Sequence, residues 1–247
     1  MRITFLLSLY LLTGSIWAQK YKVRSITPER LEVTACLDQT PDEKAMEIIS
    51  TYKEKVDSIM SPVLGMSKVA MDSHRPESLL SNWIADVLLE TSTATGLPQA
   101  DMSLINIGGI RNYMPKGIIR RGDIILISPF DNRLVVLELK GSDVMELMKN
   151  IAIAHGEGVS KNVRLEITED GTLIDATISG KPIDKNRIYT IATISYLAEG
   201  NDKMSALKKY KKIHNLGLTM RDALMEYIIK NRVINSNVEG RITIKEK

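Results

Sequence analysis

Three short strand patterns in the second half of the chain limit the fold more than any other feature of this sequence. Runs of mostly apolar or β-branched residues cover 163–168, 173–179 and 187–194. Turn signals separate them, with Gly171 in the first turn and Gly180 in the second, because glycine reaches the backbone conformations that tight turns require. Strands joined in this way pair antiparallel, so this stretch predicts antiparallel sheet.

Helical patterns alternate with strand patterns along the rest of the chain. Apolar residues at helical spacing, together with capping residues, predict helices over residues 41–60, 78–92, 141–154 and 219–230. Further strands are expected over 20–37 (one or two strands), 63–71, 102–107, 124–127, 134–139 and 241–244. Several helices packed on antiparallel or mixed strands define the α+β class.

The composition is that of a globular protein and excludes several functional classes. Of 247 residues, 44% are hydrophobic and 26% are charged, which rules out a disordered or collagen-like chain. The net charge is only +3, and the basic run over residues 208–212 is interpreted as solvated surface, so we expect no nucleic-acid partner. The single Cys36 excludes an intrachain disulfide and a cysteine-based zinc site.

The N-terminus has the pattern of a secretory signal peptide. Arg2 supplies a positive charge, residues 5–12 are a short apolar run, and Ala18 is the small residue expected before a cleavage point. The run is shorter than the about 20 residues that a membrane-spanning helix needs. We expect residues 1–18 to be removed, leaving a periplasmic or secreted chain without a membrane span; a buried N-terminal helix is the alternative.

The histidines give little support for a metal site. Asp72 and His74 have the Asp-x-His spacing that begins many dimetal phosphatase sites. Such a site needs several further nitrogen and oxygen ligands, and His155 and His214 stand isolated in the sequence. We interpret the Asp-x-His triplet as incidental and expect no catalytic residue, no metal ligand and no cofactor in this chain.

Three loop sequences carry the strongest binding signals. Residues 106–111 follow a strand and contain two glycines, which permit a tight turn and a close backbone approach to a ligand. Arg111 at its end can offer a planar guanidinium to a carboxylate or a phosphate. Residues 129–132 and 196–202 each place an aromatic residue on a loop, and two such rings can hold a flat ring between them.

Each loop signal also has a purely structural interpretation. Gly-Gly turns are common, Phe130 can anchor the core, and Tyr196 can pack beneath its own loop. Asp202 can serve as the N-cap of a helix that starts near Lys203, since Asp is a favoured N-cap residue. The three motifs together, in this order and at these spacings, favour a binding site.

With these motifs, the stretch from about Val63 to Lys230 resembles the C-terminal domain of the secreted 5'-nucleotidases and UDP-sugar hydrolases, over about two-thirds of the chain. The resemblance is carried by residues 75–86, 106–111, 117–123, 129–132 and 196–202. It implies a four-layer α/β/β/α sandwich that binds the nucleotide substrate. The main domain is then expected over residues 61–247, preceded by a strand and helix extension over 19–60.

The resemblance also implies a set of site residues. The two rings that stack on the base correspond to Phe130 and Tyr196, and the acid that holds the ribose hydroxyls corresponds to Asp202. An asparagine and two arginines complete the implied pocket, at Asn106, Arg75 and Arg111. This chain departs from the family pattern at four positions: Tyr196 replaces a phenylalanine, and Ile107, Asn201 and Lys203 replace glycines.

The same resemblance places the chemistry elsewhere. In the family, hydrolysis belongs to an N-terminal dimetal phosphatase domain, and the about 40 to 60 residues before the resemblance are too few for a domain of that kind. We expect the nucleotide- or nucleoside-binding half of a split 5'-nucleotidase, inactive without a separately encoded metallophosphatase that supplies the divalent metals. A non-catalytic periplasmic nucleotide-binding module is the alternative, and a structural domain that has lost its pocket is a third.

Overall fold

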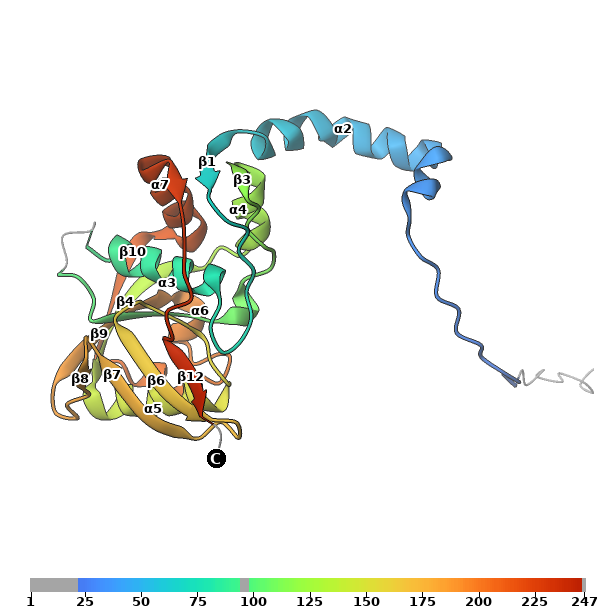
Figure 1. Cartoon of the computed structure of the whole chain (residues 1–247). Helices are drawn as coiled ribbons and strands as arrows, with labels where there is room; N and C mark the ends of the chain where they lie inside the picture. The colour runs from blue at the N-terminus through green and yellow to red at the C-terminus, as the bar shows by residue number, and fades with distance from the viewer. Residues whose placement is uncertain (1–21, 94–97, 246–247) are drawn as a thin grey trace, which may run out of the picture. The chain divides into compact units, whose positions relative to one another are not determined.

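The computed structural model of this chain describes residues 22–93 and 98–245 (Figure 1). The chain divides into two compact units, residues 1–49 and residues 50–247. The expected signal peptide, residues 1–18, lies outside the described residues.

The described part of the first unit contains little regular structure. Residues 22–34 form neither helix nor strand, and Ala35–Gln39 form a short 3-10 helix, η1. The prediction of one or two strands over 20–37 is therefore wrong for the described part of that range. Leu31 and Val33 alternate with polar residues, but both side chains are more than four-fifths exposed, and alternation alone does not make a strand without a partner to pair with.

The predicted helix over 41–60 is confirmed as α2 (Glu43–Met60), which begins in the first unit and ends in the second. Its helical spacing is real, but the apolar side chains at that spacing, among them Ile48, Tyr52 and Val56, are exposed. Among the described residues, no helix is both long enough and apolar enough to cross a membrane.

The second unit is built around three sheets. The largest has the strand order β10-β4-β9-β2-β5 and consists of β2 (Met102–Ile105), β4 (Arg133–Lys140), β5 (Gly158–Val159), β9 (Ile188–Ile194) and β10 (Lys212–Thr219). The second, of order β12-β6-β7-β8, consists of β6 (Val163–Thr168), β7 (Leu173–Ile178), β8 (Lys181–Pro182) and β12 (Ile242–Lys245). The third, of order β11-β1-β3, consists of β1 (Val63–Ser67), β3 (Gly117–Arg120) and β11 (Val233–Ile234).

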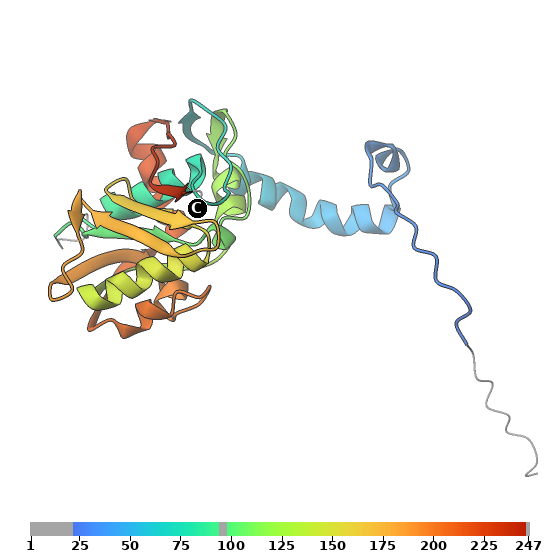
Figure 2. The ribbon, with the colours of Figure 1, turned by 60° about the horizontal axis from the view of Figure 1, so that its bottom comes forward.

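Helices cover the largest sheet, as Figures 1 and 2 show. Helix α3 (Leu79–Thr91) packs on β2 and β5 and against α7 (Met220–Asn231). Helix α5 (Gly141–Ile153) contacts β4 and β9 and also β6 and β7 of the second sheet. Consecutive residues are buried in the middle of β4 and at the end of β9, so both faces of the sheet are covered. The α+β class and the helices α3, α5 and α7 are as predicted.

One predicted strand is a helix. Residues 124–127 belong to α4 (Arg121–Ile127), where Ile124 and Ile127 are buried and Leu126 is exposed, which is helical spacing. The Asp123 carboxylate accepts a hydrogen bond from the Arg120 backbone nitrogen at 2.7 Å and so caps the helix. The strand expected over 63–71 ends at Ser67, and β3 and β10 were not anticipated.

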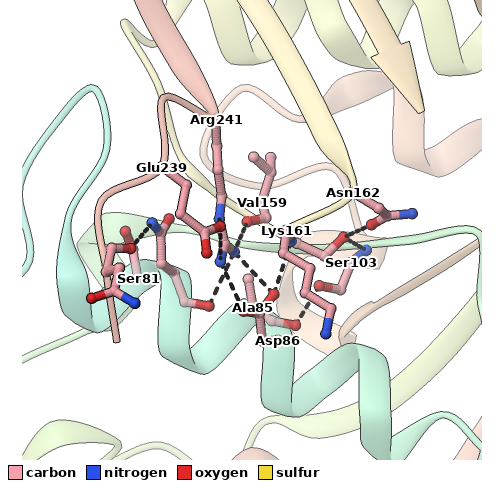
Figure 3. A network of polar contacts seen from close by, with 12 residues as sticks. Ser81, Ala85, Asp86, Ser103, Val159, Lys161, Asn162, Glu239 and Arg241 are labelled. Atoms are coloured by element: carbon pink, nitrogen blue, oxygen red, sulfur yellow. Dashed lines mark hydrogen bonds and ion pairs between the residues drawn. The ribbon is translucent and has the colours of Figure 1, made fainter. Parts of the chain in front are cut away.

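A buried ion pair ties the C-terminal strand to α3 (Figure 3). Arg241, which is 2% exposed, directly precedes β12. Its Nη1 and Nη2 donate to the two carboxylate oxygens of Asp86 on α3 at 2.9 and 2.8 Å, and Nη1 also donates to the carbonyl of Val159 in β5 at 2.8 Å. The Arg241 side chain is buried and that of Asp86 is partly exposed, and these contacts link α3, β5 and the start of β12.

Candidate functional site

The loops that carry the predicted site residues meet at one end of the largest sheet. Strands β2 and β9 are parallel neighbours, with Met102 opposite Ile191, so their carboxyl ends lie at the same edge. Strand β4 is antiparallel to β9, with Leu134 opposite Ile194, so β4 begins at that edge. The loops that leave β2 and β9 therefore lie beside the loop that enters β4, although the three are far apart in the sequence.

A cavity of about 480 Å³ opens between these loops. Five of the six predicted site residues line it, and the full lining is Asn106, Gly108, Gly109, Arg111, Phe130, Asn132, Tyr196 and Asp202. Ligand pockets in proteins commonly enclose about 300–1,000 Å³. The cavity has the size and the mixed aromatic and polar lining of a small-molecule site.

The two aromatic rings at the cavity are not core anchors. Phe130, in the loop between α4 and β4, is 46% exposed, and Tyr196, in the short helix α6 (Ser195–Ala198), is 38% exposed. Arg221 in the first turn of α7 holds the Phe130 loop, because it donates to the carbonyls of Ser128 at 3.0 Å and of Phe130 at 3.2 Å. Exposed rings on held loops remain available to a ligand.

The Asp202 carboxylate accepts hydrogen bonds from two other predicted site residues. Its Oδ2 accepts a hydrogen bond from Asn106 Nδ2 at 2.6 Å, and its Oδ1 accepts one from the Tyr196 hydroxyl at 2.8 Å. The interpretation of Asp202 as a helix N-cap is wrong, since the next helical segment, η3 (Ser205–Lys209), begins three residues later with Met204 as its N-cap. The carboxylate instead faces the cavity from the loop that follows α6.

Asn106 directly follows β2, lines the cavity and is buried, with 2% of its surface exposed. Its Oδ1 atom has no hydrogen-bond partner within the part of the chain that the structure describes. A Cβ atom added at Gly109 would lie 2.7 Å from that oxygen, so a larger residue there would force the Asn106 side chain to shift. The group that lies close to this glycine is therefore the side chain of Asn106.

The two predicted arginines lie in different cavities. Arg111 lines the cavity of the aromatic rings, and its Nη1 donates to the Gly108 carbonyl at 3.2 Å. Arg75 lines a neighbouring cavity of about 410 Å³, and Asp202 contributes to the lining of both. Arg75 forms an ion pair with Glu157, and its Nε donates to the Gly156 carbonyl at 2.9 Å. The structure thus does not bring Arg75 to the cavity of the other five residues.

Glu157 is the site-supporting residue that sequence reasoning missed. Its side chain is 1% exposed, and its carboxylate accepts hydrogen bonds from the Ile107 backbone nitrogen and from Arg75. Burial raises the pKa of the Glu157 carboxyl, while the Ile107 N–H and the Arg75 charge act in the opposite direction. The only signal in the sequence is an acid between two glycines, Gly156 and Gly158. In the structure, both glycines lie too close to neighbouring atoms to carry a Cβ.

The Asp72–His74 pair is exposed, and the nearest side-chain atoms of the two residues are 3.9 Å apart. Over residues 22–93 and 98–245, no group of three or more His, Cys, Asp or Glu side chains is arranged to hold a metal ion. The described residues therefore do not fit a two-metal centre, and we derive no step through a metal in this chain.

Comparison with known proteins identifies the family. The sequence model described as 5'-nucleotidase, C-terminal domain, matches residues 62–209. The chain belongs to this family. The match contains the cavity residues and Glu157.

Several relatives are considerably longer proteins. Endonuclease YhcR of Bacillus subtilis (strain 168) is 30% identical over 220 residues, which are 83% of this chain and 17% of that protein. The 5'-nucleotidase precursor of Thermus thermophilus matches with a TM-score of 0.73 and 26% identity, over 83% of this chain and 43% of that one. Protein UshA of Escherichia coli (strain K12) is 23% identical over 80% of this chain and 36% of its own length. The chain spans less than half of each, and the expected family and fold are confirmed.

The raised pKa of Glu157 predicts a pH dependence of stability. Between the ordinary carboxyl pKa of 4.5 and the higher folded value, the folded protein binds more protons at Glu157 than the unfolded chain does. The contribution of this titration to stability is full below pH 4.5 and is lost as the pH rises through the folded pKa. In urea unfolding, the free energy of unfolding of the wild type relative to Glu157→Gln is expected to fall as the pH rises above 4.5.

The matched control for this measurement is Glu54→Gln, which removes an exposed carboxyl on α2. The free energy of unfolding of the wild type relative to Glu157→Gln would contradict the raised pKa of Glu157 if it stayed constant from about pH 4 to about pH 8 or rose with pH.

Proposed function

We propose that this chain binds a nucleoside or nucleotide in the cavity at the end of the largest sheet, as the substrate-recognising part of a 5'-nucleotidase. The observation that carries the proposal is the placement of two exposed rings, Phe130 and Tyr196, at one cavity that also holds a carboxylate, Asp202. The rings come from loops on different strands, so they are suited to approach a flat base from opposite sides.

The polar groups of the cavity match the other parts of a nucleoside. An ionised carboxylate only accepts hydrogen bonds and has about four acceptor positions, of which two on Asp202 are taken by Asn106 and Tyr196. The remaining positions suit the two hydroxyls of a ribose. The buried Oδ1 of Asn106 suits a donor on the ligand, because an unpaired buried acceptor costs about 1–3 kcal/mol.

Arg111 supplies the positive charge of the cavity. Within the described residues, the hydrogen bond found for this side chain uses one of its donors, which points to the Gly108 carbonyl. A guanidinium is a donor-only group that pairs with phosphate oxygens through two parallel hydrogen bonds. We assign it to the phosphate or ribose side of the ligand, while Arg75 and Glu157 support the site from the adjacent cavity.

We further propose that hydrolysis requires a dimetal phosphatase that is not formed by the described residues, supplied by a separately encoded metallophosphatase chain. The support is that the matched family model is a C-terminal domain and that the described side chains gather no three-ligand metal group. A two-metal site activates the attacking water and neutralises the phosphate. Both chains would meet in the periplasm or outside the cell, after removal of the signal peptide.

The base-stacking assignment is tested with Phe130→Ala. Base–aromatic stacking contributes about 1–3 kcal/mol per base, so the variant is expected to bind adenosine about tenfold or more weakly than the wild type in calorimetry. Tyr52→Ala, which removes an exposed ring on α2, is the control and is expected to bind as the wild type does. Absence of adenosine binding at millimolar concentration in the wild type, or equal binding by Phe130→Ala, would refute the assignment.

The proposed division of binding and hydrolysis between two chains is tested by measuring phosphate release. The purified chain with added divalent metals is expected to release no phosphate from adenosine 5'-monophosphate. Mixed with a secreted metallophosphatase that is its partner, it is expected to increase the release, and Phe130→Ala is expected to lose that increase. Metal-dependent turnover that co-purifies with this chain alone would overturn this division, and failure of every candidate phosphatase would favour a binding-only module.

A further inference from the structure

The loop from Tyr196 to Lys203 is closed by its own side chains. The Tyr196 hydroxyl donates to Asp202 Oδ1 at 2.8 Å, and Asn201 Nδ2 donates to the Tyr196 carbonyl at 2.9 Å. Tyr196 is thus bonded at both its hydroxyl and its backbone to the turn that presents the acid.

The turn that these bonds hold has an unfavourable backbone. Asp202 has a φ of 51° and Lys203 a φ of 66°, so two consecutive residues with side chains lie in the left-handed region. That conformation costs about 1–2 kcal/mol for a residue other than glycine. Contacts around the turn must offset this cost, and for Asp202 these are the hydrogen bonds of its carboxylate.

The two oxygens of that carboxylate are held from two elements. Asn106 approaches from the end of β2, and Tyr196 approaches from α6. Donors at both oxygens fix the rotation of the carboxylate plane, whereas one donor leaves the plane free to turn. A tyrosine phenol, with an ordinary pKa of 10.0, is protonated at neutral pH, and the hydrogen bond to Asp202 raises the pKa of Tyr196 further, so its hydroxyl is the donor.

We propose that the Tyr196 hydroxyl is a positioning group that orients the Asp202 carboxylate to accept a ribose diol, and that it thereby sets the preference of the site for ribonucleosides over 2',3'-dideoxynucleosides. The inference deepens the proposed function and rests on it. The ring of Tyr196 stacks on the base as a phenylalanine would, while its hydroxyl controls a different part of the ligand.

The test is Tyr196→Phe, which keeps the ring and removes only the hydroxyl. Affinities for adenosine and for 2',3'-dideoxyadenosine are measured by calorimetry on the wild type and on the variant. Loss of one hydrogen bond to a charged group is expected to weaken adenosine binding about fivefold or more and to leave dideoxyadenosine binding within about twofold. Tyr52→Phe, on α2, is the matched control and is expected to change neither affinity.

A second measurement tests the positioning contact without a ligand. Melting temperatures are compared for Tyr196→Phe, Asp202→Ala and the double variant. If the hydroxyl acts through the carboxylate, the double variant is expected to melt no lower than the less stable single variant, because both remove the same contact.

The outcomes distinguish failure of the Tyr196 positioning role from failure of the proposed nucleoside binding. If the wild type binds neither ligand, the proposed function fails and the inference falls with it. If Phe130→Ala weakens both ligands while Tyr196→Phe leaves the ratio of the two affinities unchanged, the proposed function stands and the inference is overturned. Equal weakening of both ligands by Tyr196→Phe, or additive losses of melting temperature, also overturns it.

Discussion

A single buried carboxylate, that of Glu157, is the constraint on which the arrangement of the site depends. A carboxylate at 1% exposure is costly unless its oxygens are paired, and the two partners here are the Arg75 guanidinium and the Ile107 backbone N–H. The second contact fixes the backbone directly after Asn106. Asn106 in turn binds Asp202, and Asp202 binds Tyr196. One chain of polar contacts therefore runs from the buried Glu157 carboxylate to an aromatic ring at the cavity.

This arrangement divides the cavity into a polar side and an aromatic side. On the polar side, Asn106 is buried and Asp202 is exposed, and hydrogen bonds join Asp202 to Asn106 and Tyr196, so these groups are largely positioned before a ligand arrives. The aromatic side consists of Phe130 and Tyr196, which are each more than one-third exposed. Under the proposed function, the polar side would recognise the sugar by its geometry and the aromatic side would recognise the base by stacking area.

The sequence predicted the elements whose signals are local. The helix α3 is marked by its apolar stripe and by Ser78 before it, and β6 and β7 by the turn at Gly171. Residues 124–127 were assigned to a strand because four consecutive residues include three isoleucines and a leucine; the deciding signal was the Asp123 cap. The run over 20–37 alternates but has no partner strand among the described residues, and pairing is not visible in local sequence.

The site was predictable in its parts but not in its connections. Asn106, Phe130 and Tyr196, which were named from separate loop motifs, line one cavity because parallel and antiparallel pairing brings those loops to one edge of the sheet. Glu157 was missed because its role depends on hydrogen bonds from residues 50 and 82 positions away in the sequence. For the same reason the ion pair that directs Arg75 into the neighbouring cavity has no signature in the sequence.

The most direct test of the account uses the scarcity of phenylalanine. The sequence contains two, Phe5 and Phe130, so a chain that begins at residue 19 has only Phe130. Labelled with 4-fluorophenylalanine, it gives a single ¹⁹F resonance from the ring assigned to the base. We predict that this resonance shifts saturably with adenosine and does not shift with ribose 5-phosphate. A resonance that ignores adenosine at millimolar concentration, or that responds equally to both, would contradict base recognition between Phe130 and Tyr196.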